Sequence, residues 1–102
     1  NGGSYNGKQI LGKRTVELML SAQGDHLLGD DDFCLGFALT SKKSAAANMR
    51  NAGSFAWGGY YGTYYWADPK EKMIFLIMIQ YTSNSNYEFV DKSFNIMYGI
   101  LK

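Results

Sequence analysis

The fold of this chain is decided by residues 53–70, which read GSFAWGGYYGTYYWADPK. Aromatic and small residues dominate two short runs, 54–59 and 63–67, and such runs bounded by glycine predict β-strands. Residues 68–71, Asp-Pro-Lys-Glu, carry proline at the second position, which is typical of a type I turn. This stretch therefore predicts two consecutive strands followed by a tight turn.

An apolar segment and an amphipathic segment follow the turn. Residues 72–81 are apolar on both faces, a pattern typical of a central strand in a sheet. Residues 84–102 predict a helix, because Ser85 and Glu88 have the spacing of a capping box. One apolar stripe runs along this helix and consists of Val90, Phe94, Met97 and Leu101. Three further apolar residues widen it: Phe89, Ile96 and Ile100.

The N-terminal half predicts one more helix and one more strand. Residues 1–12 are rich in Gly and Asn and predict a loop, whereas residues 13–23 place apolar side chains on one helical stripe. After a polar loop, residues 33–40 alternate large apolar residues with small ones and predict a strand. Residues 41–53 predict a loop or a hairpin tip. The expected fold class is therefore α+β: an antiparallel sheet of about four strands flanked by an N-terminal and a C-terminal helix.

Composition and charge limit the class of protein. The chain has 102 residues, of which 46% are hydrophobic and 19% charged, and its formal net charge is +1. One domain at most fits this length, and the balanced charge argues against electrostatic capture of nucleic acid or an anionic membrane. The longest apolar run, Met73–Ile79, is far too short to span a membrane. We therefore expect a globular domain with no nucleic-acid partner and no membrane span.

Few residues of the chain suit a metal. The chain contains one His and one Cys, so a metal site built from soft ligands is not expected. Cys34 lies in an apolar run and is expected to be a small buried residue rather than a nucleophile. His26 lies in a polar loop and is expected to be exposed. The acidic run Asp30–Asp32 lacks the spacing and the bidentate Glu of a calcium loop, so neither a metal nor a cofactor is predicted.

Residues 53–70 closely resemble the C-terminal strand pair of the β-lactamase-like superfamily of penicillin-recognising serine hydrolases, which includes class C β-lactamases, D,D-peptidases and related esterases. In that family a strand with a Lys/His/Trp-x-Gly signature is followed by the pattern G-T-x-x-W-x-D-P and an apolar strand. Here Trp57-Gly58-Gly59 and residues 62–69 stand at those positions. Residues 1–19 resemble the family's upstream loop and helix. The resemblance implies that residues 1–102 are a single C-terminal sub-domain of a larger hydrolase domain, periplasmic or extracellular in location.

The resemblance also assigns roles to the residues around the signature. Trp57, Gly58, Gly59 and Tyr61 would contact the substrate, and the glycines would leave room for a substrate backbone beside the strand. The backbone N–H of Tyr60 would be one oxyanion-hole donor. Trp57 stands where many relatives have Lys, so the resemblance favours ester or peptide-like substrates over β-lactams.

Two family signatures have no convincing counterpart in this chain. No Ser is followed by a Lys three residues later, which is the spacing of the family's nucleophile motif. Ser4-Tyr5-Asn6 has the spacing of the second motif but lies in a loop, and we interpret it as a chance match. Without a nucleophile and a general base, this chain is predicted to be inactive by itself.

The predicted function is the substrate-side portion of a serine hydrolase that acts on small-molecule ester, amide or peptidoglycan-type bonds. One alternative is a non-catalytic module that binds peptidoglycan or carbohydrate through its aromatic residues. A second alternative is a degenerate relative that serves only as a scaffold.

Three structural expectations follow from the same residues. Tyr64 and Trp66 are expected to pack in the core, and Asp68 is expected to cap the turn rather than act as a catalytic carboxylate. The family's strands beside residues 72–81 are missing here, so we expect Met73–Ile79 to form an apolar edge that pairs with another chain or is covered by the tail helix. Self-association through strand 72–81 is the corresponding partner prediction.

Overall fold

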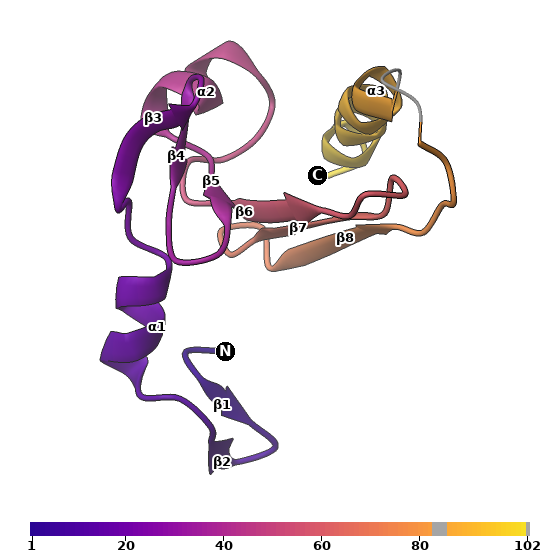
Figure 1. Cartoon of the computed structure of the whole chain (residues 1–102). Helices are drawn as coiled ribbons and strands as arrows, with labels where there is room; N and C mark the ends of the chain where they lie inside the picture. Colours follow the sequence, from indigo (N-terminus) through magenta and orange to yellow (C-terminus); the bar gives the residue numbers. More distant parts are fainter. Residues whose placement is uncertain (83–85, 102) are drawn as a thin grey trace.

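The computed structural model describes residues 1–82 and 86–101. These residues form an α+β fold, as predicted, but they contain two antiparallel sheets where one was expected (Figure 1). The smaller sheet is the hairpin of β1 (Ser4–Tyr5) and β2 (Lys8–Gln9). The prediction of a loop over residues 1–12 is therefore wrong for these two short strands. The larger sheet has six strands rather than about four. In chain order, which is also their order in the sheet, they are β3 (Gly24–Leu28), β4 (Asp31–Phe33), β5 (Ala38–Leu39), β6 (Phe55–Gly58), β7 (Tyr64–Asp68) and β8 (Met73–Ile77).

The prediction of one strand over residues 33–40 is wrong, because the chain reverses direction inside it. The backbone N–H of Cys34 donates to the Phe37 carbonyl at 2.9 Å, and Gly36 has a φ of 92°. Glycine adopts this left-handed conformation at little cost, so it closes the turn. Strand β4 therefore ends before the turn and β5 begins after it, which removes the expected alternation of faces. The loop predicted over residues 24–32 is also wrong, since it contains β3 and the start of β4.

The segment predicted as the loop 41–53 contains a short helix, α2 (Lys42–Ala47). The Ser41 hydroxyl accepts a hydrogen bond from the Ser44 backbone N–H at 3.0 Å, so Ser41 is the N-cap. Three consecutive alanines complete the helix, and alanine has the highest helix propensity. Both signals were present in the sequence and could have indicated this helix.

The two predicted helices are present but shorter than expected. Helix α1 (Lys13–Met19) ends four residues before the predicted end at residue 23, and it contains no buried residue. Figure 1 shows α1 and the β1–β2 hairpin extending away from the larger sheet. Helix α3 (Asn86–Gly99) lies within the predicted range 84–102, and the capping-box residue Ser85 lies outside the described residues.

The core lies between α3 and one face of β6, β7 and β8. Trp66 is completely buried, and its ring contacts Phe94 and Tyr98 at centroid distances of 4.8 and 4.9 Å. Because Val90, Phe94 and Tyr98 are four residues apart, they form the buried stripe of α3. The predicted core positions of Trp66 and Phe94 are thus confirmed. The buried residues of this core are Ala56, Trp66, Ile77, Val90, Phe94 and Tyr98.

Among the described residues, strand β8 lies at the edge of the sheet and pairs with β7 alone. The prediction of a central strand over residues 72–81 is therefore wrong for this chain, and the prediction of an apolar edge is confirmed. Met73, Phe75 and Ile77 turn toward the α3 core. On the other face, Ile74 and Leu76 are 72% and 61% exposed, so helix α3 covers only one side of this strand.

Candidate functional site

Strands β6 and β7 are joined by residues 59–63, in which Gly59 and Thr63 flank the turn residues Tyr60, Tyr61 and Gly62. The Gly62 backbone N–H donates to the Gly59 carbonyl at 3.0 Å, and the Gly59 N–H donates to the Thr63 carbonyl at 2.7 Å. Gly62 has a φ of 83°, whereas neither Tyr60 nor Tyr61 has a positive φ. A type I turn followed by a left-handed glycine is a standard hairpin connection, and it places Tyr60 at the second position of the turn.

The two glycines of the signature have a structural role within the hairpin. A Cβ on Gly59 would clash with Oγ1 of Thr63, and a Cβ on Gly58 would lie 3.3 Å from Cδ2 of Tyr64. These positions therefore favour glycine whether or not a substrate lies beside the strand. From the sequence, only room for a substrate had been predicted as the reason for these glycines.

The edge of β6 that faces β5 is open at its C-terminal end. Along β6, Ala56 is the last residue that pairs with β5. On the same edge of β6, before the strand begins, the Thr40 N–H donates to the Ser54 carbonyl at 2.8 Å. Backbone groups alternate between the two edges of a strand, and the Gly59 N–H is used on the β7 side. The backbone N–H groups of Gly58 and Tyr60 therefore point to the open edge. Among the described residues, none accepts a hydrogen bond from the Tyr60 N–H.

Aromatic side chains surround this open edge. Trp57 is partly exposed and meets Phe33 edge-to-face at 5.5 Å. Tyr60 is 86% exposed, and its ring contacts the exposed ring of Tyr61 at 5.2 Å. Tyr64 instead packs against the α3 core, 6.0 Å from Phe94, as predicted. The predicted site residues thus occupy one continuous turn and strand end.

A hollow lies on each side of Gly58 and Gly59. The larger one, of about 760 Å³, lies on the α3 side and is bordered by Asp31, Arg50 and Asp91. The smaller one, of about 320 Å³, lies on the opposite face and is mostly apolar. Its lining includes Trp57, Tyr65, Leu76 and Met78. The hairpin tip therefore separates a groove of mixed polarity from an apolar hollow.

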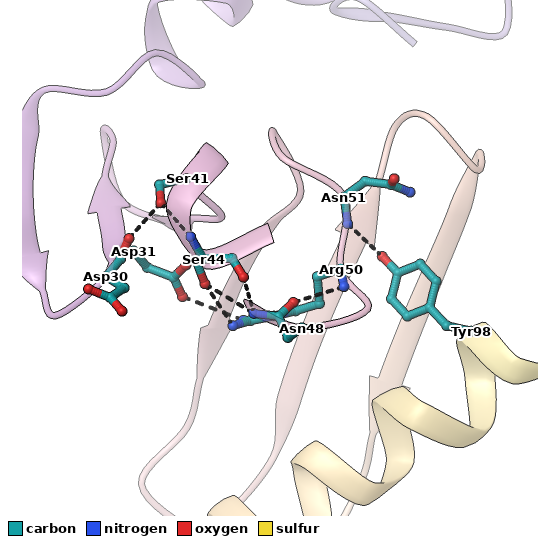
Figure 2. Close-up of polar contacts among 8 residues, drawn as sticks. All are labelled: Asp30, Asp31, Ser41, Ser44, Asn48, Arg50, Asn51 and Tyr98. Carbon is teal, nitrogen blue, oxygen red and sulfur yellow. Dashed lines mark hydrogen bonds and ion pairs between the residues drawn. The ribbon is translucent and has the colours of Figure 1, made fainter. Parts of the chain in front are cut away.

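A polar cluster around Arg50 borders the larger hollow (Figure 2). Its guanidinium lies 3.5 Å from the Asp31 carboxylate and donates to Asn48 Oδ1 at 3.2 Å and Ser44 Oγ at 3.3 Å. The guanidinium carbon lies 5.6 Å from the centre of the Phe94 ring. Arg50 therefore connects β4, α2 and α3. Arg50 was not predicted from the sequence, because its contacts with Asp31 and Phe94 join residues far apart in the chain.

Asp68 is the centre of a second polar cluster. Its Oδ1 accepts hydrogen bonds from the backbone N–H groups of Lys70 at 2.8 Å and Glu71 at 3.1 Å, so its predicted role as a turn cap is confirmed. Its Oδ2 accepts from the Tyr98 hydroxyl at 2.5 Å and from Asn51 Nδ2 at 2.7 Å. Figure 2 also shows the Tyr98 hydroxyl facing the Asn51 backbone. The cluster ties the end of α3 to the β7–β8 turn and to the loop before β6.

The hydrogen bonds of this cluster shift the pKa values of the Asp68 carboxyl and the Tyr98 hydroxyl. Burial by itself would raise the pKa of the Asp68 carboxyl. The hydrogen bonds that it accepts outweigh burial and lower this pKa, and the largest contributions come from Tyr98 and then Asn51. Burial and the Asp68 carboxylate raise the pKa of the Tyr98 hydroxyl. Asp68 is therefore held ionised in a structural role.

The remaining candidate residues show no catalytic arrangement. Cys34 is buried, its Sγ donates to the Phe37 carbonyl at 3.2 Å, and burial raises the pKa of its thiol, which disfavours the reactive thiolate. Asp30 and Asp31 are ion-paired with Lys43 and Arg50, and no group of three potential metal ligands occurs in the described part of the chain. The side chain of His26 lies outside the described residues.

No helix among the described residues has the length and apolar character that a bilayer crossing requires.

Comparison with known proteins identifies the fold but not a sequence family. No protein-family model and no curated protein matches this chain. Two engineered variants of simvastatin synthase (LovD) from Aspergillus terreus share its structure. The LovD9 mutant matches with a TM-score of 0.68 and the LovD6 mutant with 0.64, each at 18% identity over 89% of this chain. The chain spans 30% of the length of these proteins. It therefore has the fold of a fragment of a β-lactamase-like protein, as predicted.

Proposed function

We propose that this chain is the C-terminal, substrate-side portion of a larger β-lactamase-like serine hydrolase that acts on ester, amide or peptidoglycan-type bonds. The observation that carries the proposal is the open edge at Gly58 and Tyr60, where a backbone N–H that has no acceptor among the described residues lies beside two glycines. The fold shared with simvastatin synthase supports it. A periplasmic or extracellular location belongs to the same proposal.

In this proposal the substrate carbonyl lies along the open edge of β6. The Tyr60 N–H donates to the carbonyl oxygen, and this hydrogen bond strengthens as negative charge develops in the transition state. Trp57 supplies an apolar wall beside the acyl group. Since an indole cannot pair with a carboxylate as a lysine would, the site suits neutral acyl groups.

The nucleophile has to come from outside the described residues. The Ser41 hydroxyl is the cap of α2 and donates to the Asp30 carbonyl at 2.6 Å, and Ser44 Oγ accepts from Arg50. Neither has the Lys partner that activates a serine in this superfamily. We therefore expect the chain by itself to turn over neither p-nitrophenyl acetate nor nitrocefin.

The Tyr60 donor can be removed without removing the turn. Proline has no N–H, and it is favoured at the second position of a type I turn, so Tyr60→Pro keeps the hairpin while deleting the donor. In the full-length protein, we expect kcat for p-nitrophenyl acetate to fall about 10²- to 10³-fold, as for other oxyanion-hole donors. The control is Tyr60→Ala, which keeps the N–H and should change kcat by less than about threefold, a few tenths of a kcal/mol. Equal losses in both variants, or no loss in Tyr60→Pro, would contradict the assigned role.

A second candidate function is binding of peptidoglycan or carbohydrate without catalysis. The exposed rings of Trp57, Tyr60 and Tyr61 favour it, because exposed aromatic faces are common recognition surfaces. Calorimetric titration of this chain alone with peptidoglycan fragments distinguishes the two proposals. Saturable binding that Tyr60→Ala weakens supports the binding module, whereas the hydrolase portion should bind nothing until the rest of the protein is supplied.

A further inference from the structure

The larger hollow, of about 760 Å³, lies beside the open edge of β6 and is in the size range of small-molecule sites. Strands β3 to β7 and helix α3 all contribute to its lining. Gly58, Gly59 and Tyr60 line it from the strand end, and Asp91 lines it from α3. A substrate whose carbonyl oxygen is held by the Tyr60 N–H therefore has this hollow next to it.

The two substituents of such a carbonyl have different surroundings. The carbonyl carbon is planar, so the acyl group and the leaving group lie on opposite sides of the C=O bond. Trp57 provides an apolar wall for the acyl group and also lines the smaller, mostly apolar hollow on the face away from α3. The leaving group therefore extends into the larger hollow, on the α3 side.

One charge in the lining of the larger hollow has no compensating partner among the described residues. Three charged side chains line it: Asp31, Arg50 and Asp91. Asp31 and Arg50 form an ion pair at 3.5 Å, so their charges largely cancel (Figure 2). No cation in the described part of the chain is paired with Asp91, since the neighbouring Lys92 is paired with Glu88 at 2.6 Å. Two carboxylates and one guanidinium give this lining a net charge of −1.

Aromatic side chains supply much of the remaining lining. Trp57, Tyr60 and Tyr64 all border the hollow, and the Tyr64 ring is held against Phe94 at 6.0 Å. Burial is the main cause that raises the pKa of the Tyr64 hydroxyl, and the Asp91 carboxylate adds to it, so this carboxylate and this ring are neighbours. Aromatic faces attract cations and are a common means of binding ammonium groups. Aromatic rings beside an uncompensated carboxylate are therefore suited to an ammonium group.

We infer that the larger hollow selects substrates whose leaving group carries an ammonium group, and that Asp91 sets this preference. The inference rests on the proposed function, because it requires a carbonyl held at Tyr60. In hydrolysis the bond between the carbonyl carbon and the leaving group breaks, and water supplies a hydroxyl to the acyl group and a proton to the leaving alcohol, thiol or amine. Asp91 takes no part in that exchange and acts only by binding the cation.

Two thioesters of the same shape test the inference in the full-length protein. One is acetylthiocholine, and the other is its uncharged isostere, in which carbon replaces the quaternary nitrogen; release of the thiol follows both reactions. We expect Asp91→Asn to lower the ratio of kcat/KM for the cationic ester to kcat/KM for the neutral ester by about fivefold, the upper end of the range for exposed charge pairs. Comparing the ratio between proteins cancels the difference in intrinsic reactivity of the two esters.

The ionic strength gives a second measurement that needs no variant. Because Asp91 is exposed, added salt should screen its charge and lower the same ratio in the wild type. This reading decides the inference even if Asp91→Asn fails to fold.

The matched control is Glu17→Gln, which also removes one exposed helix carboxylate, but from α1, outside the lining of the hollow. This variant should leave the ratio unchanged. An unchanged ratio in Asp91→Asn, equal falls in both variants, or a wild-type ratio that does not respond to salt would overturn the inference and leave the proposed function standing. A full-length protein that hydrolyses neither thioester nor p-nitrophenyl acetate would overturn the proposed function, and this inference with it.

Discussion

The hydrogen bond between Tyr98 and Asp68 should be one of the strongest single contributions to the stability of this fold. The Tyr98 hydroxyl lies 2.5 Å from Asp68 Oδ2, and both residues are buried. Tyr98→Phe removes one oxygen and leaves the ring that packs against Trp66. The variant therefore tests the hydrogen bonds of the hydroxyl and not the packing of the helix. These are the short bond to Asp68 and the longer one, 3.4 Å, from the Asn51 N–H.

The expected magnitude follows from what Asp68 retains. A hydrogen bond to a charged group contributes about 1.5–3 kcal/mol. After the substitution Asp68 still accepts from Asn51, Lys70 and Glu71, so its carboxylate is not left without donors. We therefore expect a loss of about 2 kcal/mol in the free energy of unfolding, which lowers Tm by about 10 °C in a domain of this size.

Urea unfolding followed by tryptophan fluorescence and circular dichroism measures this loss. Tyr5→Phe is the control, because Tyr5 is exposed and its hydroxyl is not held by a buried carboxylate; it should change stability by less than about 0.5 kcal/mol. If Tyr98→Phe cost no more than Tyr5→Phe, the argument that this cluster ties α3 to the sheet would be refuted.

Two further predictions concern the same fold. The lowered pKa of Asp68 predicts stability that is present above the pKa of an unfolded Asp, about 3.9, and that is lost as pH falls through the folded value. Urea unfolding between about pH 7 and pH 2 measures this loss. Asp68→Asn should be less stable than the wild type near neutrality and should lose less stability as the pH falls. An unchanged dependence of stability on pH would contradict the assigned ionisation. Separately, Gly59→Ala should destabilise by about 1–3 kcal/mol because its Cβ meets Thr63 Oγ1. Thr63→Ala should restore much of that loss in the double variant, and strict additivity of the two changes would show that the clash is not the cause.

The sequence predicted best where one stretch of chain specifies its own structure. The run 54–68 contains the turn residues that join β6 to β7, and both strands occur within two residues of the predicted ends. Part of the α3 stripe was predicted correctly, because Val90 and Phe94 follow a helical period. The predicted stripe residues Phe89, Ile96 and Ile100 are exposed, and Tyr98 is buried instead. Local pattern failed for β3 and β4, which contain Gly or Asp, and for β5, which has only two residues. Their strand conformation is specified by pairing with neighbours, and one glycine, Gly36, divides an otherwise regular alternation.

The candidate site was predictable only in part for the same reason. Trp57 to Tyr61 were selected by resemblance, and the structure adds the open edge and the turn position of Tyr60, which depend on where β5 stops pairing. Arg50 and Tyr98 carried no local signal. Their partners, Phe94 and Asp68, lie 44 and 30 residues away in the chain, so only the folded structure brings them together.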